Sequence, residues 1–299
     1  MTVIKSHPLP QHPEGSPFLT QDYEDVMSEL KDKAEGDQPV KWQEQWQWEM
    51  SNVHLFLIQM IERAYLYAPY AIESNDLSNF LGYAEISFFQ VYSHHSGEEE
   101  YIFPTFVKYS KNELWSKNVS EHHTFDQALD ATWLYIRSCQ EKLPAANGDS
   151  KRVKSPVPPP PADLIRSIDL RSFPNLDFDE PFDVVGFRKH IESFIVPLVE
   201  HLGSEIDTLT PELMDSVGPE GDKDVRKWLD SHLKAYDPAW FLCSAFASVP
   251  ISLCKQMIQL PFLVRRILVP FLLAPKYRGY WLYAPYPEVR PFFTSPDRK

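Results

Sequence analysis

Cysteine is scarce in this chain. The 299 residues contain only Cys139, Cys243 and Cys254, and no two of these have the Cys-x-x-Cys spacing of a thiolate metal site. An odd total cannot pair completely within one chain, so the cysteines predict neither a disulfide framework nor a zinc–thiolate site. Prolines also break up residues 1–18, which hold no apolar stretch of the length that a secretory leader needs. We therefore expect a cytoplasmic protein.

The chain is also short of positive charge. It has 29 lysines and arginines against 42 aspartates and glutamates, which gives a net charge of -13 at pH 7. Nucleic acids and anionic headgroups attract patches of Lys and Arg and would be repelled by most of such a surface. We therefore expect no nucleic-acid partner, and no feature of the sequence indicates a particular protein partner.

Residues 240–273 form an apolar segment, but not a long uninterrupted one. A bilayer crossing needs about 20 consecutive apolar residues. Prolines and basic residues interrupt this segment at Pro250, Lys255, Pro261, Arg265, Arg266 and Pro270. We expect short helices packed on the rest of the protein without membrane contact, and an interfacial membrane anchor is the alternative.

Helical periodicity is the main pattern that the sequence does contain. Four segments, residues 42–68, 76–103, 114–143 and 187–209, have apolar residues at steps of three and four, which places them on one face of an α-helix. Pro69 and Pro144 are expected to end the first and third helices, Pro104 to end or kink the second, and Pro197 to kink the fourth. The pattern predicts an all-α fold.

The segments between these helices define the organisation of the chain. Residues 1–38 are polar and rich in proline, which predicts a flexible arm with one short helix near residues 23–33. Residues 42–210 should form an up-down four-helix bundle, in which the proline-rich residues 143–181 make a long crossover loop. Residues 211–299 should be a helical extension packed on the bundle, with a helix near residues 222–235.

Histidines and carboxylates recur on the apolar faces of these helices. In three of the helices a histidine is followed four residues later by a carboxylate, a spacing that stacks the two side chains about 6 Å apart along one face. The first helix has a lone histidine at an apolar position. The candidate ligands are His54, His94 with Glu98, His122 with Asp126, and His201 with Glu205.

A metal centre explains this pattern better than chance. A carboxylate that faces a helical core without a partner costs several kcal/mol of desolvation, which a cation removes. Imidazole and carboxylate ligands without thiolate suit iron, manganese or zinc, and paired sets on facing helices are how bundles build dinuclear sites. We expect one or two iron ions, with manganese or zinc as alternatives.

Two positions leave the register open. His95 with Glu99 has the same spacing as His94 with Glu98, and the apolar face that leads through Val91 favours His94. Similar phase reasoning favours His122 over His123. Both neighbouring histidines could also contribute, one to the metal and one to its surroundings. His190 lies one helical step off the face of the fourth helix, which indicates a surface or supporting residue.

The segments HHSGEEEYIFP (94–104), EHHTFDQALD (121–130) and HLGSEIDTL (201–209) resemble the motifs of the hemerythrin-like, or HHE cation-binding, family. The resemblance spans about residues 42–210 and implies an up-down four-helix bundle around a non-heme, often di-iron, centre. Matched by motif, it implies the ligands named above. The apolar segment with the WLYAPYPEVRP ending resembles extensions on fungal members of this family.

Asp126 stands where the oxygen carriers of that family have a second histidine. More carboxylate and less imidazole should stabilise ferric iron and disfavour reversible release of dioxygen. We therefore expect a metal-binding protein that senses or handles oxygen, peroxide, redox state or iron, more than an enzyme. The alternatives are a di-iron oxidoreductase that acts on peroxide or a small organic substrate, and a metal-free helical interaction module.

Overall fold

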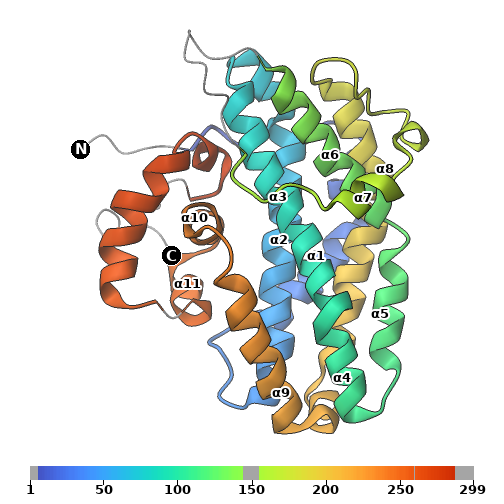
Figure 1. Cartoon of the computed structure of the whole chain (residues 1–299), viewed down its shortest axis with the longest axis vertical. Coiled ribbons are helices and arrows are strands. Elements are labelled where there is room, and N and C mark those ends of the chain that lie inside the picture. The colour runs from blue at the N-terminus through green and yellow to red at the C-terminus, as the bar shows by residue number, and fades with distance from the viewer. Residues whose placement is uncertain (1–5, 144–154, 259, 287–299) are drawn as a thin grey trace.

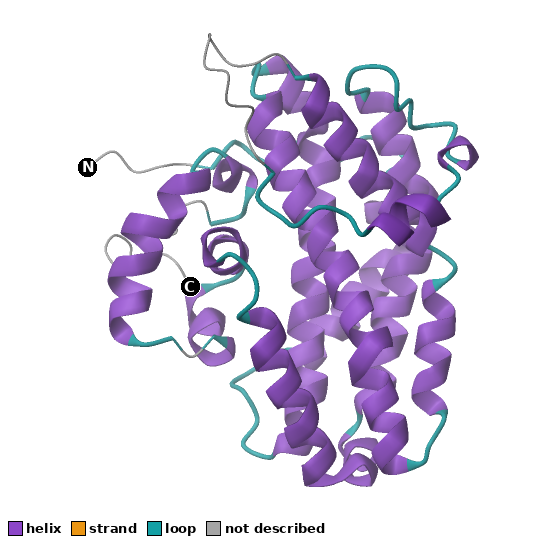
Figure 2. Ribbon diagram, in the orientation of Figure 1, coloured by secondary structure: helices purple, strands orange, loops and turns teal. Residues whose placement is uncertain are grey.

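The computed structural model describes residues 6–143, 155–258 and 260–286. Every regular element in these ranges is helical, and none of the described residues forms a strand (Figure 2). The prediction of an all-α fold is therefore confirmed.

The centre of the molecule is a ring of four helices in which each packs against the next (Figure 1). They are α2 (Trp42–Glu73), α3 (Leu77–Gly97), α6 (Asp126–Lys142) and α8 (Val184–Glu205). Large side chains from all four fill the space between them, and burial of each stabilises the fold by roughly 1.5–3 kcal/mol. Fully buried examples, one from each helix, are Ile61, Phe80, Ile136 and Leu198.

Helix α2 does not end at Pro69, so that prediction was wrong. The helix continues to Glu73 because another part of the fold replaces the hydrogen bond that proline cannot make. The carbonyl of Tyr65, four residues before Pro69, accepts a hydrogen bond of 2.9 Å from Nε of Arg188 on α8. The Arg188 guanidinium also lies over the Tyr65 ring, 4.6 Å from its centroid.

The Arg188→Met variant is expected to lower the free energy of unfolding by roughly 1–3 kcal/mol, because it leaves the Tyr65 carbonyl buried without a donor. Methionine keeps an apolar stem of similar length, so the loss reports mainly on the hydrogen bond. Urea unfolding followed by circular dichroism measures the change. The exposed neighbour Lys189, changed to Met, is the control. Equal stabilities of the two variants would contradict this account of Pro69.

Pro104 does not end the second helical segment either. After α3 the chain passes through the π-helical turn η2 (Glu98–Ile102) and continues as α4 (Phe103–Ser110), with Pro104 in the first turn of α4. In a regular α-helix the proline ring collides with the carbonyl four residues before it, and the wider π turn gives the ring room. The π turn begins at the candidate ligand Glu98.

The third predicted helix is broken into α5 (Leu114–His122) and α6. Thr124 Oγ1 donates to the Glu121 carbonyl at 2.8 Å, and the Phe125 amide donates to the His122 carbonyl at 3.0 Å, a tighter pattern than that of an α-helix. Phe125 is buried, with its ring 5.4 Å from the ring of His201. The prediction of a continuous helix over residues 114–143 was therefore wrong.

The N-terminal segment is packed on the helical core where the structure describes it. Residues 17–33, expected within a flexible arm, form the short helix η1 (Pro17–Leu19) and α1 (Gln21–Lys33), which lies against α2 and α8. Phe18 and Leu30 are buried in this contact. The predicted short helix is present, but the predicted flexible arm is corrected for this part of it, because two large apolar side chains anchor it.

The crossover between α6 and α8 is described from residue 155 onward, and residues 144–154 of the predicted loop lie outside the described residues. The described part of the crossover contains α7 (Ala162–Ser167) and the short helix η4 (Leu170–Ser172). Glu85, fully buried on α3, binds the first described residue of this part. One Glu85 oxygen accepts from Ser155 Oγ at 2.7 Å and from Arg137 Nη1 at 2.8 Å.

The C-terminal third forms further helices on the outside of the ring. η5 (Ile206–Leu209) leads into α9 (Pro211–Leu233), which contains the predicted helix, bends at Gly218 and packs on α2 and α4. The later elements are α10 (Pro238–Ser248), α11 (Ile251–Met257), η6 (Val264–Leu273), η7 (Ala274–Tyr277) and η8 (Tyr280–Tyr283).

The last described helix, η8, is seated on α3. The ring of Tyr280 lies on Gly82, where any Cβ would come within 2.2 Å of a ring carbon.

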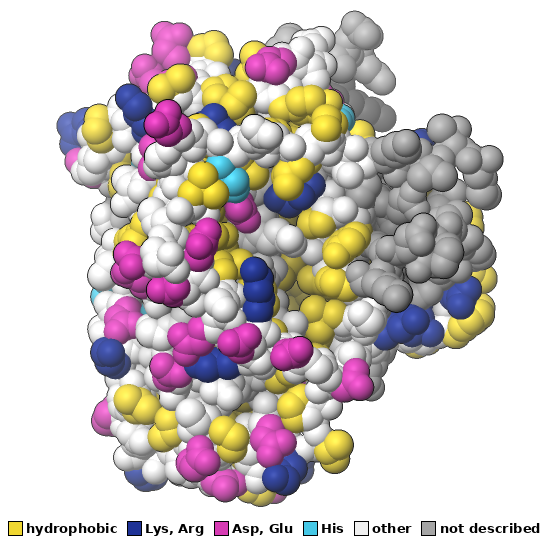
Figure 3. Space-filling view, turned by 180° about the vertical axis from the view of Figure 1, so that it is seen from behind, with side chains coloured by type: hydrophobic (Ala, Val, Ile, Leu, Met, Phe, Trp, Pro, Cys, Tyr) yellow, Lys and Arg dark blue, Asp and Glu magenta, His cyan; other side chains and the backbone are white. Residues whose placement is uncertain are grey.

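No helix among the described residues has the length and apolar character to cross a bilayer. On the face shown in Figure 3, acidic side chains are scattered together with basic ones and do not leave a large basic patch.

Candidate metal centre

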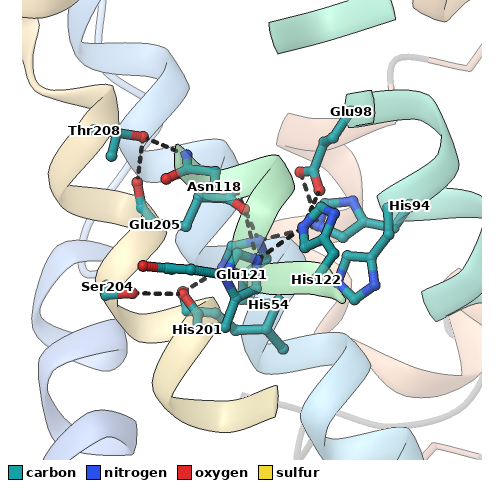
Figure 4. Close-up of polar contacts among 12 residues, drawn as sticks. His54, His94, Glu98, Asn118, Glu121, His122, His201, Ser204, Glu205 and Thr208 are labelled. Atoms are coloured by element: carbon teal, nitrogen blue, oxygen red, sulfur yellow. Dashed lines mark hydrogen bonds and ion pairs between the residues drawn. The ribbon is translucent and has the colours of Figure 1, made fainter. Parts of the chain in front are cut away.

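Histidine and glutamate side chains from separate helices meet in the interior (Figure 4). α2 supplies one histidine, α3 and η2 a histidine and a glutamate, the end of α5 another histidine, and α8 a histidine and a glutamate. All but one of these residues are buried, and His94 is partly buried. The six residues are His54, His94, Glu98, His122, His201 and Glu205.

One half of the cluster, here called the His54 half, contains His54 and His94. Their Nε2 atoms are 3.0 Å apart. Oε1 of Glu98 lies 3.1 Å from Nε2 of His94, and Oε1 of Glu205 lies 3.6 Å from Nε2 of His54. Two nitrogens and two oxygens from three helical segments thus converge.

The other half, the His122 half, repeats this arrangement. The Nε2 atoms of His122 and His201 are 2.9 Å apart. The second oxygens of the same two carboxylates face them, with Glu98 Oε2 3.9 Å from His122 Nε2 and Glu205 Oε2 3.2 Å from His201 Nε2. Each glutamate therefore presents one oxygen to each half, which is how a carboxylate bridges two ions.

Hydrogen bonds on the outer nitrogens orient three of the rings. His54 Nδ1 donates to the Leu202 carbonyl at 2.7 Å, His122 Nδ1 to Glu99 Oε1 at 2.7 Å, and His201 Nδ1 to Glu121 Oε2 at 3.2 Å. These acceptors fix the proton on Nδ1 and leave Nε2 directed at the centre. Metal-binding histidines in proteins are commonly held in this way.

The donor atoms fit a pair of cations. When His122 and His201 are both neutral, their Nε2 lone pairs face each other at 2.9 Å, which is repulsive unless a proton or a metal ion lies between them. Two nitrogens bound to one ion at about 2.1 Å and at a right angle are separated by about 3.0 Å. The four carboxylate oxygens of Glu98 and Glu205 are buried and accept no hydrogen bond. Such oxygens require a cation or a proton.

The two glutamates influence each other's ionisation, because both are buried in the same cluster. Burial and the neighbouring Glu205 raise the pKa of Glu98 well above its usual range. Burial also disfavours ionised Glu205, but His201 and His54 outweigh it and lower the pKa of Glu205 to about 2. Burial lowers the pKa of His94 to about 3. Without a metal ion, Glu98 therefore binds a proton more readily than an exposed glutamate does, and a cation would compete with that proton.

Asp126, the remaining predicted ligand, lies at the edge of this cluster and not among its six residues. Its donor atom is grouped with those of Glu99 and His122, and its Oδ1 lies 3.7 Å from His95 Nδ1. Since the chain leaves the helix at residues 123–125, Asp126 does not stack over His122 as a continuous helix would require. The predicted pairing of these two residues on one helical face was wrong.

Sequence reasoning did not predict several contacts of Glu99, Glu121 and His190. Glu99 and Glu121 orient His122 and His201, but each meets its histidine from a different helical segment, so no local spacing indicates the contact. His190 is buried, not on the surface, and is bonded through Nε2 to the Ala128 carbonyl at 2.8 Å. The phase argument placed His123 outside the cluster, and it is exposed.

Asp130, near the cluster on α6, should make stability depend on pH. Burial, reinforced by Glu99, raises the pKa of Asp130 to about 7. The folded state then keeps a proton that the unfolded state loses near pH 4, so stability falls as pH rises from about 4 to 7. At about 1.4 kcal/mol per pKa unit, Asp130→Asn should stabilise the metal-free protein by roughly 1–4 kcal/mol at pH 8 and not at pH 3.

Thermal unfolding of the metal-free chain across this pH range measures the effect. Glu141, exposed on the same helix, changed to Gln is the matched control. A stability gain of Asp130→Asn that does not change with pH would show that the aspartate is not the titrating group.

This chain is similar to a known protein over about half of its length. No family model matches it, and no solved structure matches it. It is similar to the dimeric xanthone biosynthesis cluster protein R11 of Cryptosporiopsis sp. (strain 8999), with 25% identity over 162 residues. The match covers 54% of this chain and 47% of R11, so the chain spans about half the length of this curated relative.

Proposed function

We propose that this chain is a metal-binding protein of the hemerythrin-like type that holds two iron ions. In this proposal α2, α3, the α5–α6 segment and α8 form the up-down four-helix bundle, with the ions between them. The observation that carries the proposal is the pair of buried carboxylates, each of which presents one unpartnered oxygen to each pair of facing imidazole nitrogens.

His54 and His94 would hold one ion, His122 and His201 the other, and Glu98 and Glu205 would contact both. Imidazole and carboxylate donors without thiolate suit iron, and manganese or zinc are the alternatives. When bound, iron supplies a redox-active centre for small oxidants such as dioxygen or peroxide. The chain keeps the imidazoles oriented through Leu202, Glu99 and Glu121 and excludes bulk water, which suits sensing or handling of oxygen or iron.

A second candidate is an oxidoreductase that uses the same centre on peroxide or a small organic substrate. The name of R11, which places that protein in a biosynthesis cluster, favours this reading. Steady turnover by the iron-loaded chain would separate an enzyme from a sensor or carrier. The third reading, a metal-free interaction module, requires that a proton shared by Glu98 and Glu205, together with His201, takes the place of the cations.

Metal analysis tests the proposal. The wild-type chain, loaded with ferrous iron without oxygen and then passed through a desalting column, should retain two ions and gain near-ultraviolet absorption in air. His201→Ala should lose at least the ion of the His122 half, while the exposed His123→Ala should behave as wild type. A wild-type chain that binds no metal under iron-replete conditions would end the proposal.

A further inference from the structure

His95, the sequence neighbour of the candidate ligand His94, is also buried, although it is not one of the six residues of the cluster. It is 3% exposed, and neither of its ring nitrogens has a hydrogen-bond partner. Buried histidine nitrogens normally have one, and a buried polar group without a partner costs about 1–3 kcal/mol. The other buried histidine outside the cluster, His190, follows this rule through the Ala128 carbonyl.

The ring of His95 lies against the His122 half of the centre. It stacks on the His122 ring at a centroid distance of 4.4 Å and an interplanar angle of 29°, and its centroid is 5.8 Å from that of His201. One ring nitrogen from each of these three histidines lies within 4.8 Å of the others. This is a compact group of three imidazoles, contributed by α3, α5 and α8.

Helical geometry explains how neighbouring histidines reach different halves. Successive residues of an α-helix point about 100° apart, so His94 can face α2 while His95 faces α5 and α8. His94 accordingly meets His54, with ring centroids 5.1 Å apart, whereas His95 meets His122. His94 and His95 are therefore not exclusive alternatives, because each lies beside a different half of the centre.

We propose that His95 is the third imidazole ligand of the ion in the His122 half, and that Asp126 is a positioning residue for His95. This inference rests on the proposed function. Oδ1 of Asp126 lies 3.7 Å from Nδ1 of His95, so a small shift would let Nδ1 donate to the carboxylate while Nε2 binds the ion. Carboxylates beside the outer nitrogen orient ligand histidines in this way. Asp126 is thereby placed beside the ligand set and not in it.

Cobalt(II) is a suitable probe because it is stable in air and reports its ligands in visible absorption. The wild-type chain should bind two Co(II) ions. His95→Gln should weaken one of them by more than about 100-fold, while Asp126→Asn should weaken the same ion by about 10–100-fold, the range for loss of an orienting partner. His123→Gln should change neither. The two affinities are measured by competition with a chelator, and circular dichroism shows whether each variant is folded.

The outcomes separate this inference from the proposed function. A wild-type chain that binds neither Co(II) nor Fe(II) overturns both. Two ions in wild type, with unchanged affinities in a folded His95→Gln, overturn only the role of His95. A greater loss in Asp126→Asn than in His95→Gln would instead make Asp126 the ligand.

A measurement on the wild type alone keeps the inference testable if His95→Gln does not fold. Each imidazole bound to Co(II) gives one strongly shifted, exchangeable N–H signal in the proton NMR spectrum. The wild type should show one more such signal than His54, His94, His122 and His201 account for. Absence of this extra signal from a chain with two bound Co(II) ions would overturn the assignment.

Discussion

Without metal, Glu98→Gln is expected to be more stable than wild type at neutral pH, and the same change should abolish tight binding of at least one ion. Glutamine has nearly the shape of glutamate but carries no charge. The Glu98 carboxylate is fully buried and accepts no hydrogen bond from the described residues. It is therefore an unfavourable group that only a proton or a cation relieves.

The sign of the pH dependence follows from the pKa of Glu98. Burial and Glu205 raise that pKa well above its usual range, so the folded state keeps a proton that the unfolded state loses near pH 4.3. Wild-type stability should therefore fall as pH rises above about 4.3, and Gln removes this loss. The advantage of Glu98→Gln should be absent at pH 3 and reach roughly 1–3 kcal/mol by pH 7.

Chemical unfolding of the metal-free proteins at several pH values, together with metal analysis, tests both halves of this expectation. The exposed Glu100, changed to Gln, is the matched control from the same acidic run. A structural network of hydrogen bonds would give the opposite result, because there the glutamate would contribute to stability. Glu98→Gln less stable than wild type at pH 7, with unchanged ion content, would therefore favour the metal-free interaction module.

The spacing of histidines and carboxylates predicted the cluster where the helix is unbroken between them. His201 and Glu205 lie on α8 and meet at 3.2 Å, and His94 and Glu98 meet at 3.1 Å where α3 passes into the π turn. The same rule failed for Asp126, because Thr124 competes for backbone hydrogen bonds and the buried Phe125 turns the chain. Local spacing is informative only as far as the local helix is continuous.

Features that depend on distant parts of the chain could not be predicted. The helix through Pro69 persists because Arg188, on another helix, bonds the carbonyl that proline leaves free. Glu121 orients His201 across a separation of 80 residues. The N-terminal segment is packed because Phe18 and Leu30 are buried against α2 and α8, with Tyr23, Val26 and Met27 partly buried beside them. Helical spacing predicted the short helix but does not show on which surface of the fold a helix packs.

Loading with iron should produce the largest change in stability of any treatment. An ion that binds only the folded chain stabilises it by RT ln(1 + [L]/Kd), which is about 4.1 kcal/mol when free iron is 1,000 times the dissociation constant. Removal of the ions by a chelator should reverse the gain. At lower pH the gain should shrink, because the raised pKa of Glu98 means that a proton competes with the cation for the carboxylate.

Calorimetric unfolding with and without ferrous iron, under nitrogen, measures this gain. In a chain with both His54→Ala and His201→Ala, each half has lost one imidazole, so iron should raise the unfolding temperature little or not at all. The His123→Ala chain should keep the full gain, because that side chain is exposed. If iron raised the unfolding temperature of the double variant as much as that of wild type, the stabilising ions would be bound somewhere other than between these helices. The buried glutamates would then need a different cation or a proton as their permanent partner.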